Sequence, residues 1–300
     1  MNDARVLRVY LEGSMLAGAR AGSFNFANVL KAAVEGAGWR LEWHETGRLA
    51  RLMAPWRRGH ALFHLQAPTH GRALTLRRAY HYPFWQIEPV AQRWRFAVAR
   101  ARFDAQAIDP DAARAFAAGL RARVLPGPMP GRGDAVLVPL QGQIRRRRSF
   151  QCMSPIDMLA AVCASGRPVI ATLHPKESYR PADHRALARL VARHPNLRIG
   201  GDSLRALRDC AFVATENSAL AFDGYLLGKP AVLFAQIDFH HIGLNVAELG
   251  AERALALAES HTPEFERYLF WFLQQQAINA ARPDAGARIL ATLRGHGWPI

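Results

Sequence analysis

Long apolar runs, paired cysteines and low-complexity segments are all missing from this 300-residue sequence. No stretch of about 18 or more apolar residues occurs, which argues against a spanning helix. The three cysteines, Cys152, Cys163 and Cys210, form no CxxC pair, so neither a disulfide framework nor a zinc ribbon is indicated. The first apolar stretch is too short for a signal peptide. We therefore expect a cytoplasmic protein, with room for a peripheral contact at the cytoplasmic face of the inner membrane.

Lysine is scarce, although the chain is strongly basic. Only three of the 39 basic residues are lysine, and the formal net charge is +15. Such an excess predicts an anionic partner, either nucleic acid, an acidic glycan or the anionic surface of a bilayer. A run of four arginines, Arg145 to Arg148, is typical of a solvated loop, and it could also hold an anionic glycan or lipid head groups. Stacking aromatics are absent around it, which makes nucleic acid the least favoured partner.

The length fits two domains, and the alternation of strand, loop and helix predicts an α/β fold with parallel sheets. We expect a first Rossmann-like domain at residues 1–123, a linker rich in proline and glycine at 124–134, and a second Rossmann-like domain at 135–260. Helices in residues 261–300 are expected to cross back and brace both domains, which would face each other across a cleft.

The expected elements follow from hydrophobic patterns and from turn residues. In the first domain a glycine-rich loop follows the first strand, and the segment 80–88 is interpreted as irregular. Strands are expected at residues 5–11, 39–44, 60–66, 135–140, 168–173, 197–199, 210–214 and 231–235. Helices are expected at residues 25–35, 90–102, 110–123, 154–165, 183–193, 203–208, 218–227, 263–280 and 283–294.

Polar side chains follow three strands of the second domain, at the carboxyl ends where open α/β sheets bind ligands. These candidate residues are Gln141, His174, Pro175, Lys176, Glu216, Asn217 and Ser218. A helix that begins near Asn217 leaves its first N–H groups free for an anion, and the histidine and lysine could add donors. The alternative is that these residues have only local structural roles. Asn217 or Ser218 would then cap a helix, and His174 would end a strand before a turn.

From residue 135 onward the sequence resembles the capsule polysaccharide synthesis proteins, the bacterial Kdo transferases of the capsule lipid linker. The resemblance is carried by VPLQ, by HP after a strand, by NSALAFDGYLLGKPAVLF and by HIGLN and FWFLQQQAIN, at residues 138–141, 174–175, 217–234, 241–245 and 270–279. It implies a two-domain GT-B glycosyltransferase that takes an acidic, Kdo-like sugar from a CMP donor to a glycolipid or glycan acceptor.

The resemblance also implies roles for the candidate residues. His174 would contact the CMP phosphate, Asn217 and Ser218 would lie beside it at the helix start, Gln141 would line the same site and Glu216 would face the ribose or base. Preorganised donors can stabilise the departing phosphate without a metal, which predicts a metal-independent, inverting enzyme with no cofactor. The only DxD, from Asp109 to Asp111, is better interpreted as a helix N-cap followed by proline.

The general base is the open part of this hypothesis. In the family an acidic residue precedes a glycine-aromatic pair, but here that position holds Arg77 or Arg78. Direct displacement needs a base for the acceptor hydroxyl, and the remaining candidates are Glu12, His70 and Glu88, each of which could instead be structural. A non-catalytic relative that binds an anionic glycan or an export partner is therefore the alternative function.

Overall fold

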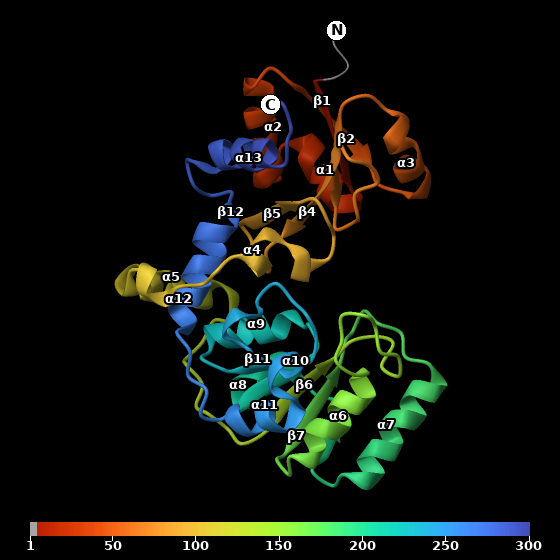
Figure 1. Ribbon diagram of the computed structural model, residues 1–300, viewed down its shortest axis with the longest axis vertical. Helices are drawn as coiled ribbons and strands as arrows, with labels where there is room; N and C mark the ends of the chain where they lie inside the picture. The colour runs from red at the N-terminus through yellow and green to blue at the C-terminus, as the bar shows by residue number, and fades with distance from the viewer. Residues whose placement is uncertain (1–4) are drawn as a thin grey trace. The chain divides into compact units, whose positions relative to one another are not determined.

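The computed structural model describes residues 5–300, which form two compact units (Figure 1). Unit 1 joins the described residues up to Ala101 with Trp271–Ile300, and unit 2 is Arg102–Phe270. Each unit is built around its own six-stranded sheet with helices. The α/β fold with two Rossmann-like units is thus confirmed.

Unit 1 has a mostly parallel sheet with the strand order β12-β5-β4-β3-β1-β2. Its strands are β1 (Val6–Leu11), β2 (Arg40–Glu45), β3 (His60–His64), β4 (Ala73–Arg78), β5 (Phe84–Glu88) and β12 (Ile278–Asn279). Strands β1 to β4 are parallel, whereas β5 runs antiparallel to β4 and β12 antiparallel to β5. The chain winds outward from β1 in both directions, so the switch point where such sheets bind ligands lies at the carboxyl ends of β1 and β3.

Both faces of the unit 1 sheet are covered, and alternate residues of β1 face opposite ways. Leu7 and Val9 join a large core with residues of α2 and α13, while Tyr10 stacks on Phe63 in a smaller core on the other face. The helical elements are α1 (Gly13–Ala21), α2 (Asn25–Gly36), α3 (Arg48–Met53), η1 (Ala54–Trp56), η2 (Arg93–Arg95), α4 (Ala97–Arg100), a π-helical turn η5 (Trp271–Gln276) and α13 (Ala285–Gly295).

Unit 2 has a fully parallel sheet with the strand order β11-β10-β9-β6-β7-β8. Its strands are β6 (Val136–Leu140), β7 (Val169–Leu173), β8 (Leu197–Ile199), β9 (Phe212–Thr215), β10 (Ala231–Leu233) and β11 (Leu244–Asn245). This is the doubly wound order of dinucleotide-binding sheets, in which the order reverses between β6 and β9. All residues of β6 are buried, as expected for a parallel strand with helices on both faces.

The helices of unit 2 begin where their sequences carry cap signals. The Ser154 hydroxyl accepts the amide of Asp157 at 3.3 Å, and Asp109 accepts the amides of Asp111 and Ala112, so both predicted N-caps form. The helical elements are η3 (Ala105–Ala107), α5 (Pro110–Val124), α6 (Pro155–Ala164), α7 (Pro181–Arg193), α8 (Ser203–Asp209), α9 (Ala219–Leu226), η4 (His240–Ile242), α10 (Val246–Leu249), α11 (Ala251–Leu257) and α12 (Phe265–Phe270).

The units divide between Ala101 and Arg102, upstream of the linker expected at residues 124–134. Helix α5, expected in the first domain, belongs to unit 2 and packs on α12. The proline- and glycine-rich segment that follows α5 is also fixed to unit 2. There the Arg208 guanidinium donates to the carbonyls of residues 125, 126 and 128, and Lys229 Nζ donates to that of Gly131 at 2.8 Å. The residues 261–300 are shared, with α12 in unit 2 and α13 in unit 1.

Four local expectations are corrected by the structure. The glycine-rich loop is largely helix α1, because its buried Leu16 and Ala19 pack on the sheet and only Gly22, with φ 72°, is needed to end the helix. The irregular segment 80–88 contains strand β5, which pairs with β4. The helix expected at 90–102 reduces to η2 and α4. The helix expected at 263–280 breaks at η5 and ends in β12.

Candidate functional site

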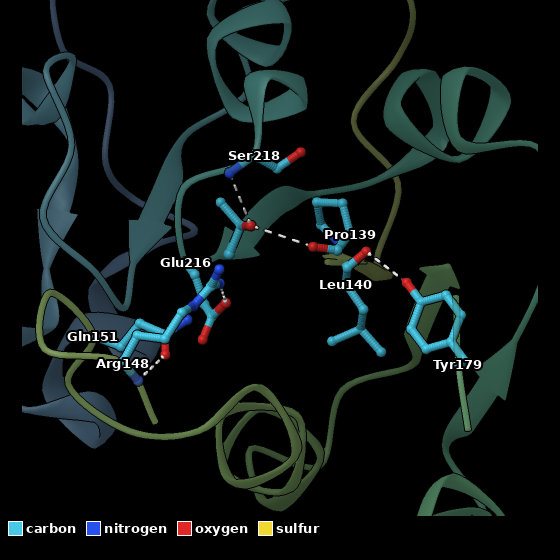
Figure 2. A network of polar contacts seen from close by, with 8 residues as sticks. Pro139, Leu140, Arg148, Gln151, Tyr179, Glu216 and Ser218 are labelled. Carbon is cyan, nitrogen blue, oxygen red and sulfur yellow. Dashed lines mark hydrogen bonds and ion pairs between the residues drawn. The ribbon is translucent and has the colours of Figure 1, made fainter. Parts of the chain in front are cut away.

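The loop after β9 lies at the switch point of unit 2, and Thr215 fixes it to β6. The Thr215 hydroxyl donates to the carbonyl of Pro139 and accepts the amide of Ser218, both at 3.4 Å (Figure 2). Ser218 caps α9, since its Oγ accepts the amide of Leu220 at 3.3 Å. The hydroxyl is largely buried and Asn217 is half-buried. A helix start with a dipole directed at this edge is suited to an anion.

Glu216 is a buried carboxylate in the same loop. Its side chain is 3% exposed, and Oε2 lies 3.4 Å from Nη2 of Arg148. Gln151 completes the cluster, because its Oε1 accepts the amide of Arg148 at 2.6 Å (Figure 2). Burial raises the pKa of Glu216 to about 7, against the lowering effects of Arg148 and Gln151. At neutral pH this carboxyl can therefore either accept or donate a hydrogen bond.

The loop after β7 carries His174, which is exposed. Its Nδ1 accepts the amide of Lys176 at 3.2 Å, so in the neutral ring the proton is on Nε2 and is available to a ligand. The Tyr179 hydroxyl accepts the amide of His174 at 3.0 Å. The same hydroxyl donates to the carbonyl of Leu140 at 3.4 Å (Figure 2). Tyr179 thereby ties the loop after β7 to the end of β6.

The loops after β6 and β7 enclose a cavity of about 670 Å³. Four cations line it, Arg145, Arg146, Lys176 and Arg180, together with the two carboxylates Glu177 and Asp183. The uncharged Gln143 and Ser178 complete the lining. The Arg145 guanidinium donates to Asp183 at 2.8 Å, and this bond, together with the Arg180 amide, holds the pKa of Asp183 below its usual range. A Cβ at position 142 would lie 2.1 Å from Glu177 Oε2, so a larger residue there would displace the Glu177 side chain. Because cations are in excess, the cavity favours an anionic ligand.

The arginine run is thus more ordered than a solvated loop. Arg145 bonds Asp183, Arg147 donates to the Gln151 carbonyl at 3.0 Å and Arg148 pairs with Glu216. Composition could not reveal the two acidic partners, because Asp183 comes from helix α7 and Glu216 from the loop after β9. The run therefore lies at the candidate site, with Arg145 to Arg147 exposed and Arg148 half-buried.

The structure brings all seven residues of the predicted nucleotide site to one edge of the unit 2 sheet. Gln141 follows β6, and the segment from Glu216 to Ser218 follows the neighbouring β9. The segment from His174 to Lys176 follows β7, on the other side of β6, and within it only Lys176 lines the cavity. The site therefore spans three adjacent strand ends.

The three base candidates of unit 1 are separated. Glu12 directly follows β1 at the carboxyl edge of the sheet. His70 lies at the opposite edge, because the loop after β3 crosses the sheet before β4 begins; Nδ1 of His70 accepts the Arg72 amide, and burial lowers its pKa. Glu88 pairs with Thr75 in the antiparallel β5 and accepts the Ala97 amide at 2.9 Å, which is a structural contact.

Sequence reasoning missed His64 as a partner for Glu12. His64 is the last residue of β3, is 8% exposed, and lies at the switch point of unit 1. Burial lowers its pKa, Glu12 raises it, and Arg77 and Arg78 lower it. The available signal was its place at the end of a strand that was expected from the sequence. Across residues 5–300, no cluster of three or more metal-binding side chains is found.

Comparisons with known proteins fit this geometry. No family model matches the sequence, and no curated protein matches it. Among solved structures, the β-Kdo 2,7-transferase KpsC of Thermosulfurimonas dismutans aligns over 96% of this chain and 98% of its own, with a TM-score of 0.53 and 11% identity. The chain shares the fold of a Kdo transferase. The β-Kdo 2,4-transferase KpsC of the same organism aligns over 87% of this chain and 88% of its own, with a TM-score of 0.43 and 11% identity. At these identities the likeness concerns the GT-B fold, which confirms the predicted architecture. Within residues 5–300, no helix has the length and apolar character to cross a bilayer.

Proposed function

We propose that this protein is a glycosyltransferase of surface polysaccharide synthesis that transfers an acidic, Kdo-like sugar from a CMP donor to a glycolipid or glycan at the cytoplasmic membrane surface. The observation that supports the proposal is that groups able to bind an anion follow adjacent strand ends of the unit 2 sheet. These are the N-terminus of α9 with Ser218, the Nε2 proton of His174 and the cavity beside Lys176.

The proposed reaction uses these donors on the leaving group. As the bond from the anomeric carbon to the phosphate oxygen breaks, negative charge grows on CMP, and preorganised N–H and ammonium groups stabilise it. Removal of one such donor typically slows a reaction by about 10²–10³. The step needs no metal in this scheme. Direct displacement by the acceptor hydroxyl would invert the anomeric centre, and the hydroxyl proton would pass to Glu12 or His64.

The test of donor binding is calorimetry with CMP. The double variant His174→Ala, Ser218→Ala should bind CMP at least about tenfold more weakly, because each lost charge-assisted hydrogen bond is worth roughly 1.5–3 kcal/mol. A matched control, His194→Ala with Ser260→Ala, changes the same residue types away from the strand ends and should bind like the wild type. Unchanged affinity in the first variant would refute the assignment of the phosphate site.

The non-catalytic alternative is favoured by one observation, the two arginines that end β4 where the family carries an acid. Release of CMP from a CMP-sugar in the presence of acceptor separates the two functions. A catalyst releases CMP and forms a product of one anomeric configuration, readable by proton NMR. A binding protein retains acidic polysaccharide and leaves the CMP-sugar intact.

A further inference from the structure

Helix α3 and the turn η1 expose their large apolar side chains. Trp56 is 82% exposed, Leu49 72%, Leu52 68% and Met53 44%. These four residues form, together with Arg48, Arg51, Arg57 and Arg58, what we call the basic-apolar patch. Contiguous apolar side chains of this size are rare on the surface of a soluble protein, and they mark an interaction site.

The patch is an amphipathic segment turned the opposite way from a normal surface helix. Its large side chains recur at intervals of three and four residues, which places them on one side of the segment. The inward side is made of alanine: Ala54 is buried in the small core with Tyr10 and Phe63, and Ala50 packs beside it. The chain thus anchors α3 through small residues and leaves its bulky residues outward.

The segment is held in place from beneath. Arg72 donates to the carbonyls of Pro55, Arg57 and Gly59 at 3.0–3.3 Å. Arg51 donates to the carbonyl of Ala67 at 3.0 Å. Because these contacts fix the backbone, the apolar side chains are presented without any rearrangement of unit 1, which lowers the entropic cost of binding.

The charge around the apolar side chains identifies the partner. The sequence from residue 47 to 59 holds four arginines and no acidic residue, and Arg48, Arg57 and Arg58 are exposed. Exposed leucine, methionine and tryptophan with flanking arginine are the composition of segments that lie in the interface of an anionic bilayer. A second copy of the same patch would bring like charges together, and nucleic acid would not cover aliphatic side chains.

We propose that the basic-apolar patch inserts into the surface of a bilayer rich in anionic lipids. Trp56 and Leu52 would enter the boundary between head groups and acyl chains, while the arginines contact lipid phosphates. The inference rests on the proposed function in one respect, which is that the protein acts at a membrane surface. It does not depend on sugar transfer, and it leaves the donor site of unit 2 untouched.

The experiment is flotation with vesicles of phosphatidylglycerol and phosphatidylethanolamine, with phosphatidylcholine vesicles as the uncharged reference. We expect the wild type to float with the anionic vesicles only, and to be released as salt rises. The double variant Leu52→Ser, Trp56→Ser should partition at least about tenfold less, because each buried side chain of this kind is worth tenfold or more. Arg57→Gln with Arg58→Gln should weaken binding and reduce its dependence on salt.

Matched controls lie in unit 2. Val191→Ser with Leu204→Ser removes two exposed apolar side chains, and Arg193→Gln with Arg198→Gln removes two exposed arginines; both should bind vesicles like the wild type. Equal flotation of the Leu52/Trp56 variant would overturn the inference, as would a change from dimer to monomer in gel filtration without any loss of flotation. CMP calorimetry on the same variant keeps the two hypotheses apart. Intact CMP binding with lost flotation supports the patch, whereas absent CMP binding in a wild type that floats refutes only the donor site.

Discussion

The buried carboxyl of Glu216 makes the stability of unit 2 depend on pH. Burial raises its pKa from 4.5 to about 7 in the folded protein. Between these values the folded chain binds more protons at this residue than the unfolded chain, so stability falls as pH rises. The contribution is fully present below pH 4.5 and lost as pH passes through about 7. Glu216→Gln removes the titration while keeping the shape of the side chain.

The size of the effect follows from the same shift. A pKa difference of about 2.5 units corresponds to roughly 3 kcal/mol of unfolding free energy, since one unit is about 1.36 kcal/mol. Between pH 5 and 7, the wild type should lose roughly 1 kcal/mol of unfolding free energy per pH unit more than the Gln variant, because the difference in bound protons stays below one. Glu252→Gln, on the exposed surface of α11, is the control and should follow the wild type.

Urea denaturation at pH 5, 6, 7 and 8 measures this difference. All seven tryptophans lie in unit 1, so fluorescence follows that unit, whereas far-ultraviolet circular dichroism follows both. The difference between wild type and Glu216→Gln should appear in the dichroism transition and grow toward pH 8, where the buried carboxyl of Glu216 is charged and the glutamine is not. Parallel curves for the two proteins across the whole range would refute the reasoning.

Three further substitutions have defined outcomes. Ser218→Ala should lower the unfolding free energy by about 1 kcal/mol through loss of the α9 cap, measured by urea denaturation. Asp183→Asn should destabilise the protein by about 1 kcal/mol, because Arg145 loses its charged acceptor, and should tighten phosphate binding by calorimetry, because the cavity gains net positive charge. Glu12→Gln should lower the pKa of His64 further in an NMR titration, because the carboxylate now raises it, and should slow turnover by about 10²–10⁴ if this pair supplies the base. An unmoved His64 titration would exclude that coupling.

Much of unit 2 could be predicted because its signals are local. Buried parallel strands are continuous apolar runs. Ser154 and Asp109 are each followed by a proline, a pattern that indicates the start of a helix. The strand expected at residues 197–199 matches β8 residue for residue, and the strands expected for β6, β7, β9 and β10 differ by one or two residues at their ends, whereas β11 was not expected. These local signals do not give the spatial order of the strands. That order places Gln141, after β6, and Glu216, after β9, at neighbouring strand ends.

The expectations that failed concern segments whose secondary structure depends on tertiary contacts. The segment that forms strand β5 is aromatic and shows no alternation of apolar and polar residues. Its pairing with β4 depends on tertiary contacts. The segment after α5 has the composition of a linker, but Arg208 supplies its carbonyls with donors from another helix. Helix α3 was not expected at all, because its apolar side chains face outward and its anchor is two alanines. Patterns of side chains along the chain carry no information about such partners.

The position of Glu12 favours the proposed catalysis over binding alone. A site that only holds an anionic glycan gains nothing from a carboxylate at the switch point of unit 1, since like charges repel the ligand. Glu12 nevertheless lies there with the imidazole of His64, whose pKa is lowered by burial and by Arg77 and Arg78. A neutral imidazole next to a carboxylate can accept a proton from a hydroxyl. The arginines at the end of β4 therefore need not remove the proposed base, because they favour the neutral form of His64.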